Sequence, residues 1–217
     1  MHASANGLAV PDVYKLSNAS SNVYTESADL NKKVNSLYAL GSFSFRDLVF
    51  LDVTARNDWS STLPAGNNSY FYPSGNLSFI VSDALMLPLW VNFTKLRASW
   101  AQVGNDSQPY IISKYYDNSP FVGSAITDNQ LYNPHLKPEQ TTSTEFGIDA
   151  RLFGNRFGFD VAYYSTISDN QILSVPLDYA TGYSSQYINA GKVQNRGIEA
   201  MAYVSPIKTK DFEWKTT

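Results

Sequence analysis

Apolar and polar residues alternate along most of the chain, which is the pattern of β-strands that turn one face toward an apolar environment. In residues 147–164, "GIDARLFGNRFGFDVAYY", polarity changes at almost every step, and a Gly-Asn pair interrupts the pattern. No segment shows helical periodicity of comparable strength. The alternation predicts strands near 36–45, 49–59, 71–81, 93–103, 143–153, 156–167 and 194–205, with an eighth that starts near 211.

The strands on either side of Gly154-Asn155 predict a definite register. A two-residue turn places Leu152 opposite Phe157, Ala150 opposite Phe159 and Ile148 opposite Val161. In that register the apolar residues share one face, and Asp149 lies opposite Asp160 on the other face. Like charges in this position cost stability, so we expect water and the diagonal Arg151 and Arg156 to relieve them.

Strand length and loop length both point to a membrane. Most predicted strands have about the 9–11 residues that a tilted strand needs to cross a bilayer, whereas globular strands have about five or six. Short and long links alternate, so an antiparallel meander places the short ones at one end, as in transmembrane barrels with short periplasmic turns. The short links are 46–48, 82–92, 154–155 and 206–210; the long ones are 60–70, 104–142 and 168–193, after an outer loop at 1–34.

Composition adds a few exclusions. The 217 residues carry a formal net charge of −3, which speaks against a nucleic-acid partner, and no cysteine, which excludes a disulfide scaffold. No apolar run reaches the length of a spanning helix, and the first residues lack the features of a secretion signal. Fifteen Tyr, twelve Phe and four Trp suit strands whose apolar surface borders water.

Two soluble or enzymatic alternatives compete with a membrane barrel. The apolar face is also compatible with the core of a secreted glycan-binding β-sandwich, because half-buried soluble strands alternate too. An outer-membrane hydrolase is disfavoured, since no nucleophile has a base within its motif. Long strands and loops sorted by end favour an all-β, antiparallel up-and-down meander of about eight strands from a large transmembrane β-barrel, with lipid against its apolar face.

Six motifs follow one another along the chain: "VTARNDWSSTLP" (53–64), "YFYPSGNLSFIVSD" (70–83), "KLRASWAQVGND" (95–106), "NPHLKPEQTTSTEFGID" (133–149), "FGNRFGFDVAYYSTISDNQIL" (153–173) and "YINAGKVQNRGIEA" (187–200). Together they resemble the SusC/RagA family of TonB-dependent outer-membrane transporters. The resemblance runs from about residue 7 to the end and implies a stretch within the C-terminal half of a barrel of about 22 strands.

The resemblance also implies function and partners. Members reside in the outer membrane, import oligosaccharides or peptides, and work with a SusD-like surface lipoprotein that acts as a lid. TonB energises them through an N-terminal plug. The 217 residues contain no recognisable plug, TonB-contacting segment or final aromatic strand, so residues 35–217 are expected to form part of such a barrel rather than all of it.

No combination of residues predicts a catalytic site, a metal site or a cofactor. The histidines, His2 and His135, belong to no catalytic motif, and neither a G-x-S-x-G elbow nor a phosphate loop occurs. Candidate cargo contacts are loop aromatics, whose rings would stack on sugars, pack the loop or contact the lid, and polar lumen residues expected near the outer strand ends. The loop set is Tyr110, Tyr115, Tyr116 and Phe121; the lumen set is Arg56, Asp58, Arg97 and Glu145.

A further group of tyrosines falls near predicted strand ends. Because tyrosine is enriched at membrane–water interfaces, these residues are expected to belong to an interfacial girdle. The group consists of Tyr70, Tyr72, Tyr163 and Tyr164.

Overall fold

The computed structural model describes residues 2–4, 6–21, 23–26, 29–118, 121 and 123–217, which fall into two compact units. The smaller unit, residues 1–32, contains a two-stranded sheet of β1 (His2–Ser4) and β2 (Tyr24–Glu26) and a short 3-10 helix, η1 (Leu16–Asn18). The Asn18 amide donates to the carbonyls of Val10 and Val13 at 2.8 and 2.9 Å. The segment that we predicted as an outer loop therefore contains short elements of secondary structure.

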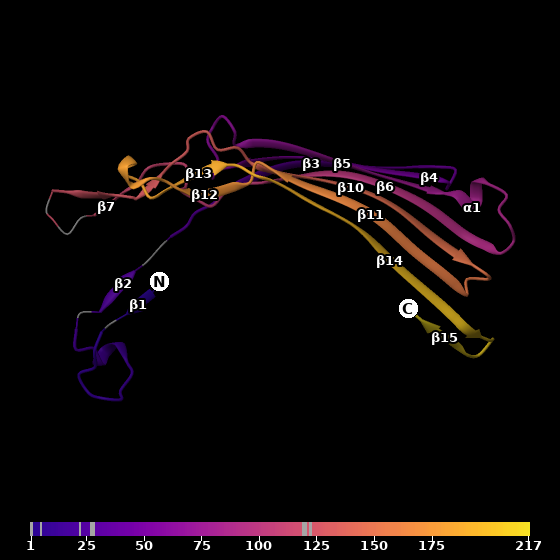
Figure 1. Cartoon of the computed structure of the whole chain (residues 1–217), viewed down its shortest axis with the longest axis horizontal. Helices are drawn as coiled ribbons and strands as arrows, with labels where there is room; N and C mark the ends of the chain where they lie inside the picture. The colour runs from indigo at the N-terminus through magenta and orange to yellow at the C-terminus, as the bar shows by residue number, and fades with distance from the viewer. Residues whose placement is uncertain (1, 5, 22, 27–28, 119–120, 122) are drawn as a thin grey trace. The chain divides into compact units, whose positions relative to one another are not determined.

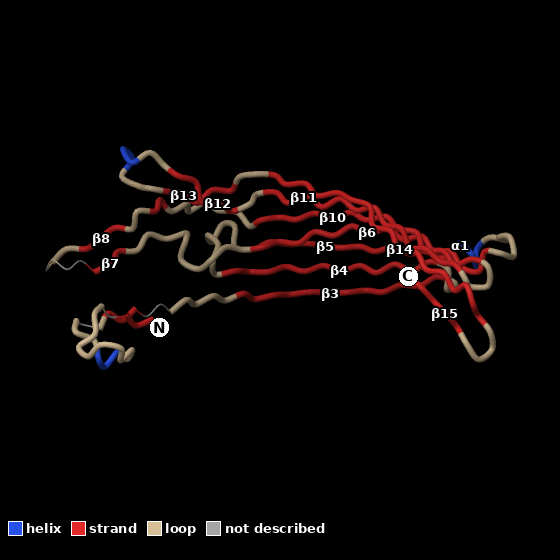
Figure 2. The backbone as a smooth tube through the Cα atoms, turned by 60° about the horizontal axis from the view of Figure 1, so that its bottom comes forward, coloured by secondary structure: helices blue, strands red, loops and turns tan. Residues whose placement is uncertain are grey.

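Eight strands of the larger unit, residues 33–217, form one antiparallel sheet in chain order (Figure 1). Figure 2 shows most of them as tubes that run side by side. They are β3 (Val34–Phe45), β4 (Val49–Ser60), β5 (Ser69–Ile80), β6 (Val91–Asn105), β10 (Glu139–Leu152), β11 (Phe157–Asp169), β14 (Lys192–Lys208) and β15 (Glu213–Thr216). All eight predicted strands and the meander are confirmed. The first seven are long enough to cross a bilayer when tilted.

The register of the hairpins agrees with the prediction. Leu152 pairs with Phe157, Ala150 with Phe159 and Ile148 with Val161. The β3–β4 hairpin has the predicted three-residue loop at 46–48, since Phe45 pairs with Val49. The β10–β11 turn has more residues than we predicted, because the last ladder pair is Leu152 with Phe157. Phe153 leaves the strand with a φ of 54°, and the Arg156 amide donates to the Phe153 carbonyl.

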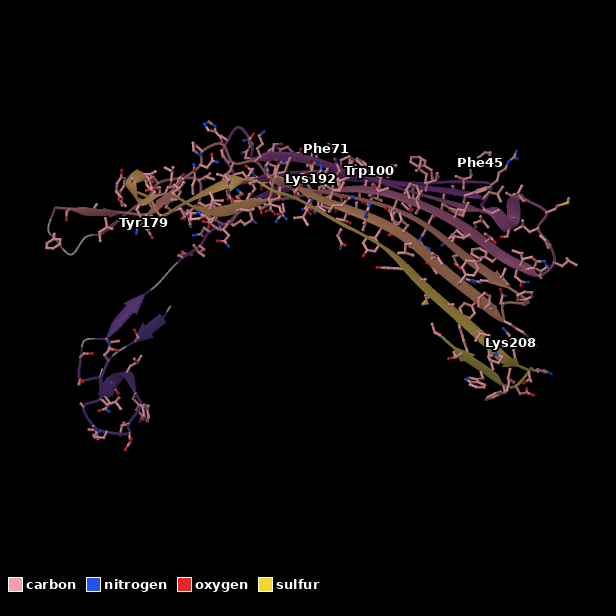
Figure 3. The ribbon with its side chains drawn as sticks, viewed as in Figure 1. Phe45, Phe71, Trp100, Tyr179, Lys192 and Lys208 are labelled. Atoms are coloured by element: carbon pink, nitrogen blue, oxygen red, sulfur yellow. The ribbon has the colours of Figure 1, made fainter. Side chains whose placement is uncertain are left out.

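One face of the sheet is apolar across seven strands. Its cross-strand neighbours form continuous rows, such as Phe45, Val49, Phe79, Leu96, Ile148, Val161 and Ala200. Phe45, Phe71 and Trp100 lie on the same side in Figure 3. Many of these side chains are exposed, with Phe43 at 61%, Phe146 at 56% and Ile198 at 72%. The β-sandwich alternative is therefore wrong, because its inward face would be covered by a second sheet.

The opposite face carries the polar residues. A typical row across this face is Ser42, Asp52, Asn76, Ser99, Glu145 and Tyr164. Hydroxyl pairs tie neighbouring strands on this face: Thr54 to Ser74 at 2.6 Å and Ser143 to Thr166 at 3.0 Å. This face is suited to contact with water.

The long and short links lie at opposite ends of the sheet, as the strand order requires. The long links carry β7 (Tyr116–Asn118), β8 (Ala125–Thr127), β9 (Gln130–Leu131), β12 (Ile172–Pro176), η2 (Tyr179–Thr181) and β13 (Ser185–Asn189). Two of these links join directly, because β9 pairs in parallel with β13. A short link holds α1 (Val81–Ala84). No helix among the described residues is long and apolar enough to cross a membrane.

The two largest fully buried side chains among the described residues, Leu136 and Thr62, lie in the long loops. Leu136 and Leu63 are 0% and 3% exposed, and Thr62 is also fully buried. The Ser107 hydroxyl donates to the Thr62 carbonyl at 2.8 Å, and the Asn67 amide donates to the Leu136 carbonyl at 3.1 Å. The first two long links thus share a small core and hold each other in place.

We expect the two faces to respond oppositely to a new charge. Ile148→Arg or Val161→Arg places a cation on the apolar face near mid-strand, which costs about 2–4 kcal/mol at the bilayer midplane. The matched control is Asn76→Arg, which places the same cation on the polar face opposite Asp52. Folding yield of the intact barrel in lipid vesicles measures the difference. Equal losses at both faces would contradict the assignment of faces.

Candidate functional site

The first polar cluster on the inner face of the sheet joins β3, β4 and β5. Arg56 Nε donates to Asp58 Oδ1 at 2.8 Å, and its Nη2 donates to the Ser36 hydroxyl at 3.1 Å. The Tyr72 hydroxyl donates to Asp58 Oδ2 at 2.6 Å. Asp58 is only 4% exposed and both of its oxygens are bonded, whereas nearly half of the Arg56 side chain is exposed. Arg56 is therefore the more exposed of the two charged groups in this cluster.

The second polar cluster joins β6, β10 and β11. Arg97 donates from Nη1 and Nη2 to the two oxygens of Asp160, both at 2.6 Å, and from Nε to Glu145 at 3.3 Å. This is a bidentate pair, the strongest geometry for an arginine and a carboxylate. Arg97 on β6 reaches across β10 to Asp160 on β11, which is two strands away in the sheet. The cluster therefore links three strands through their side chains.

Gly147 makes this reach possible. It pairs directly with Arg97 on the neighbouring strand, and an added Cβ would lie 2.4 Å from Arg97 Nε and 2.6 Å from its Cζ. The guanidinium thus passes over a position that only glycine leaves open. The sequence pattern did not reveal this, because the glycine interrupts alternation without any sign of its partner.

The negative charges of the two opposed carboxylates in the β10–β11 hairpin are neutralised by a different set of arginines from the one that we predicted. Asp149 does pair with Asp160, and Arg151 lies 3.8 Å from Asp149. Asp160, however, is neutralised by Arg97, whereas Arg156 bonds to the carbonyl of Lys208. The role predicted for Arg156 is therefore wrong, because the charge that relieves Asp160 comes from a more distant strand.

The structure also corrects the depth of two predicted lumen residues. Arg56 and Asp58 lie toward the end of β4 that adjoins the long loops, as predicted. Arg97 and Glu145 lie near the middle of β6 and β10, not at their outer ends. β10 begins at Glu139, four residues before its predicted start, which moves Glu145 toward mid-strand, whereas Arg97 lies near the middle of both the predicted and the observed β6.

Three tyrosines that we predicted for the interfacial girdle lie on the polar face instead. Tyr70 covers Gly104 and Tyr164 covers Gly197, each with ring or hydroxyl atoms within 3 Å of the position of a glycine Cβ. Tyr72 bonds to Asp58, and Tyr163 sits mid-strand in an apolar row. The girdle prediction is wrong for all four: Tyr70, Tyr72 and Tyr164 occupy the polar face, and Tyr163 lies on the apolar face but away from the strand ends.

The loop aromatics form a cluster with partners from another loop. The rings of Tyr110 and Tyr115 meet edge to face with centroids 5.6 Å apart. Lys114 Nζ lies 5.4 Å from the ring centre of Tyr116 and 5.7 Å from that of Tyr183. Its hydrogen bond to the Tyr183 hydroxyl raises the pKa of Lys114, so the amine remains cationic at neutral pH. Lys114 therefore fastens the two longest loops together.

The rings of the loop aromatics differ in how much of their surface is exposed to solvent. Phe121 is 77% exposed and Tyr116 is 63% exposed, while Tyr115 is about half exposed. Tyr110 is 39% exposed, so all four predicted loop aromatics keep part of their surface exposed. Sequence reasoning missed Lys114 and Tyr183, which lie in loops without periodicity.

Two cavities flank Tyr72 on the polar face. One, of about 400 Å³, is lined by apolar and polar groups that include Tyr38, Leu40, Arg56 and Val103. The other, of about 260 Å³, is lined mainly by polar groups that include Asn67, Glu139 and Gln140. Both open at the half of the sheet that adjoins the long loops. No group of three or more His, Asp or Glu side chains that would hold a metal occurs in the described part of the chain.

Comparison with known proteins decides the family. The family description "TonB dependent receptor-like, beta-barrel" matches residues 5–217. The chain belongs to this family. Its sheet is therefore a section of an outer-membrane β-barrel, with the apolar face toward lipid and the polar face toward the lumen.

Individual relatives agree with this assignment. TonB-dependent receptor P39 of Formosa agariphila is 30% identical over 191 residues, which are 85% of this chain and 18% of that receptor. TonB-dependent receptor SusC of Bacteroides thetaiotaomicron is 25% identical over 186 residues, 80% of this chain and 18% of SusC. The chain spans about a fifth of the length of the curated relatives that it matches.

A solved structure has the same fold. The RagAB peptide transporter superposes with a TM-score of 0.80 at 22% identity, covering 96% of this chain and 24% of that one. The SusC/RagA resemblance deduced from the six motifs is thus confirmed. The relatives are receptors and transporters by name, not enzymes.

We expect Gly147→Ala to disconnect Arg97 from Asp160. The new methyl group occupies the path of the guanidinium, so the side chain must leave its bidentate geometry. Coupling between such neighbours amounts to roughly 0.5–3 kcal/mol. Urea unfolding of the intact barrel in lipid, for Gly147→Ala, Arg97→Ala and the double variant, measures it. Strictly additive losses would show that the glycine acts independently of Arg97.

Proposed function

We propose that this chain forms part of the wall of a transporter that imports oligosaccharides or peptides across the outer membrane. The observation that carries the proposal is the two-faced sheet: an exposed apolar face over seven strands, opposed by a charged and hydroxylated face. A wall of this kind separates lipid from a water-filled passage. Membership in the TonB-dependent receptor family supports the transport role.

The end with the long loops faces the cell exterior in this proposal, and the short turns face the periplasm. Long extracellular loops and short periplasmic turns are general in bacterial outer-membrane barrels. The long loops pair through β9 and β13 and share a buried core, so they form a shaped surface at that end. Cargo would meet this surface first.

Cargo contacts divide between the loops and the lumen. Exposed rings of Tyr115, Tyr116 and Phe121 provide flat surfaces for stacking on sugars or for contact with a SusD-like lipoprotein lid. Below them, the partly exposed Arg56 side chain lines the larger of the two cavities that flank Tyr72. Arg97 is engaged with both Glu145 and Asp160, so the role of this cluster is to keep the passage wet and the wall aligned. TonB would act through a plug elsewhere in the full transporter.

An epitope tag tests the orientation. A tag inserted after Asn118, in the longest loop, should bind antibody on intact cells that carry the full transporter. A tag at Gly154, in a short turn, should be labelled only after the outer membrane is made permeable. Labelling of both positions on intact cells would contradict the proposed topology.

Ring removal tests the loop aromatics. Replacing Tyr115 and Tyr116 together by Ala should slow cargo uptake by the full transporter without lowering its abundance in the membrane, because the rings are exposed and outside the sheet. The matched control replaces both by Phe, which keeps the ring faces and the contact with Lys114, and should preserve uptake. Unchanged uptake and unchanged lid association in the Ala variant would remove these tyrosines from the site.

A further inference from the structure

A third cavity lies on the polar face, across β6, β10, β11 and β14, and has a volume of about 240 Å³. The register shows that its side chains share one face, because Ser99 pairs with Glu145, Glu145 with Tyr164, and Ser143 with Thr166. On β14, Glu199 pairs with Ala162, which also lines the cavity. The polar residues of this face that line it are Ser99, Ser143, Glu145, Tyr164, Thr166 and Glu199.

Every one of these polar side chains ends in oxygen, as four hydroxyl groups and two carboxylates. The Ser143 and Thr166 hydroxyls bond to each other at 3.0 Å, and the Tyr164 hydroxyl lies over Gly197, two residues before Glu199. The lining residues that the structure describes include no lysine, arginine, histidine, asparagine or glutamine. We call this space the oxygen-lined cavity.

The charges of the two carboxylates are only partly neutralised. Arg97 Nε donates to Glu145 Oε1 at 3.3 Å, but both terminal nitrogens of Arg97 are bonded to Asp160. One guanidinium thus faces two carboxylates, and the Glu145 side chain remains 43% exposed. Glu199 is exposed and forms no ion pair with the residues that the structure describes. The oxygen-lined cavity therefore presents negative charge to the lumen.

The oxygen-lined cavity adjoins the larger cavity beside Tyr72, because Ala101 lines both. The larger cavity offers apolar surface, since Leu40 and Val103 line it and are 72% and 54% exposed. Thr166 lies near the long-loop end of β11 and Glu199 near the middle of β14. Cargo that enters from the long-loop end reaches this half of the sheet first, and a group bound among the oxygens has room beside it for an apolar part of the same molecule.

We propose that the oxygen-lined cavity binds a primary ammonium group carried by the cargo, an inference that rests on the proposed transport function. An ammonium group has three N–H donors and no acceptor, so it matches a lining of carboxylates and hydroxyls. An anionic group would be repelled by Glu145 and Glu199. A calcium ion fits poorly, because it takes about six to eight oxygen ligands and the described residues contain no group of three or more acidic or histidine side chains suited to a metal.

Binding to the purified full transporter in lipid nanodiscs tests this site, with saturation-transfer NMR titration as the measurement. The probes are two matched pairs: trialanine with N-acetyl-trialanine, and glucosamine with N-acetylglucosamine. We expect the free amine of at least one pair to bind about fivefold more tightly than its acetylated form, the size of effect of a partly exposed ion pair. The pair that shows the preference identifies whether the ammonium group belongs to a peptide or to an amino sugar.

Two substitutions assign the preference to this cavity. Glu199→Gln keeps the shape of the side chain and removes its charge, so it should abolish most of the preference and leave the affinity for the acetylated probe unchanged. The matched control is Asp52→Asn, which removes an exposed carboxylate from the same face of β4, outside the cavity. This control should keep the full preference.

Equal binding of the amine and its acetylated form in both pairs, or binding of neither form, would overturn the proposal. So would a preference that survives Glu199→Gln, because the ammonium group would then bind elsewhere. Binding is measured without transport, so these outcomes leave the proposed transport function standing. That function is contradicted by a different result, namely failure of the full transporter to import any oligosaccharide or peptide.

Discussion

The structure depends above all on the register of the antiparallel ladder. Side chains alternate between two faces, so a slip of one residue in any strand would move its charges into lipid and its apolar groups into the lumen. The rows that run from β3 to β14 show that seven strands keep one common register. Lipid on one side and water on the other penalise any slip, so the environment itself helps to define the pairing.

Side chains on the polar face reinforce this register across several strands. Arg97 reaches Asp160 over Gly147, and Tyr203 lies over Gly158 in the same manner. In each case a large side chain covers a glycine that faces it on the neighbouring strand. The glycine loses local strand propensity, but it admits a contact that only the correct alignment allows. These contacts thus stabilise the correct register of the strands. The apolar face stabilises the sheet through its contact with lipid.

The sequence predicted the sheet well and the site only in part. Alternation locates the strands. The length of the turn predicts the register of two hairpins, as in the pairing of Ile148 with Val161. Contacts between strands that are not neighbours, such as Arg97 with Asp160, leave no trace in a pattern with a period of two. The loops have no period at all, so the bond between Lys114 and Tyr183 and the burial of Leu136 depend on tertiary packing.

Buried side chains are distributed differently in the strands and in the long loops. A soluble protein hides its apolar residues in the middle, but here the sheet leaves many of its large apolar side chains exposed, and the two buried leucines, Leu63 and Leu136, lie in the long loops. Lipid replaces a protein core for the strands, because the bilayer supplies the apolar contact. The loops project beyond the bilayer and must therefore supply a core of their own. Their shape is consequently determined by loop-to-loop packing.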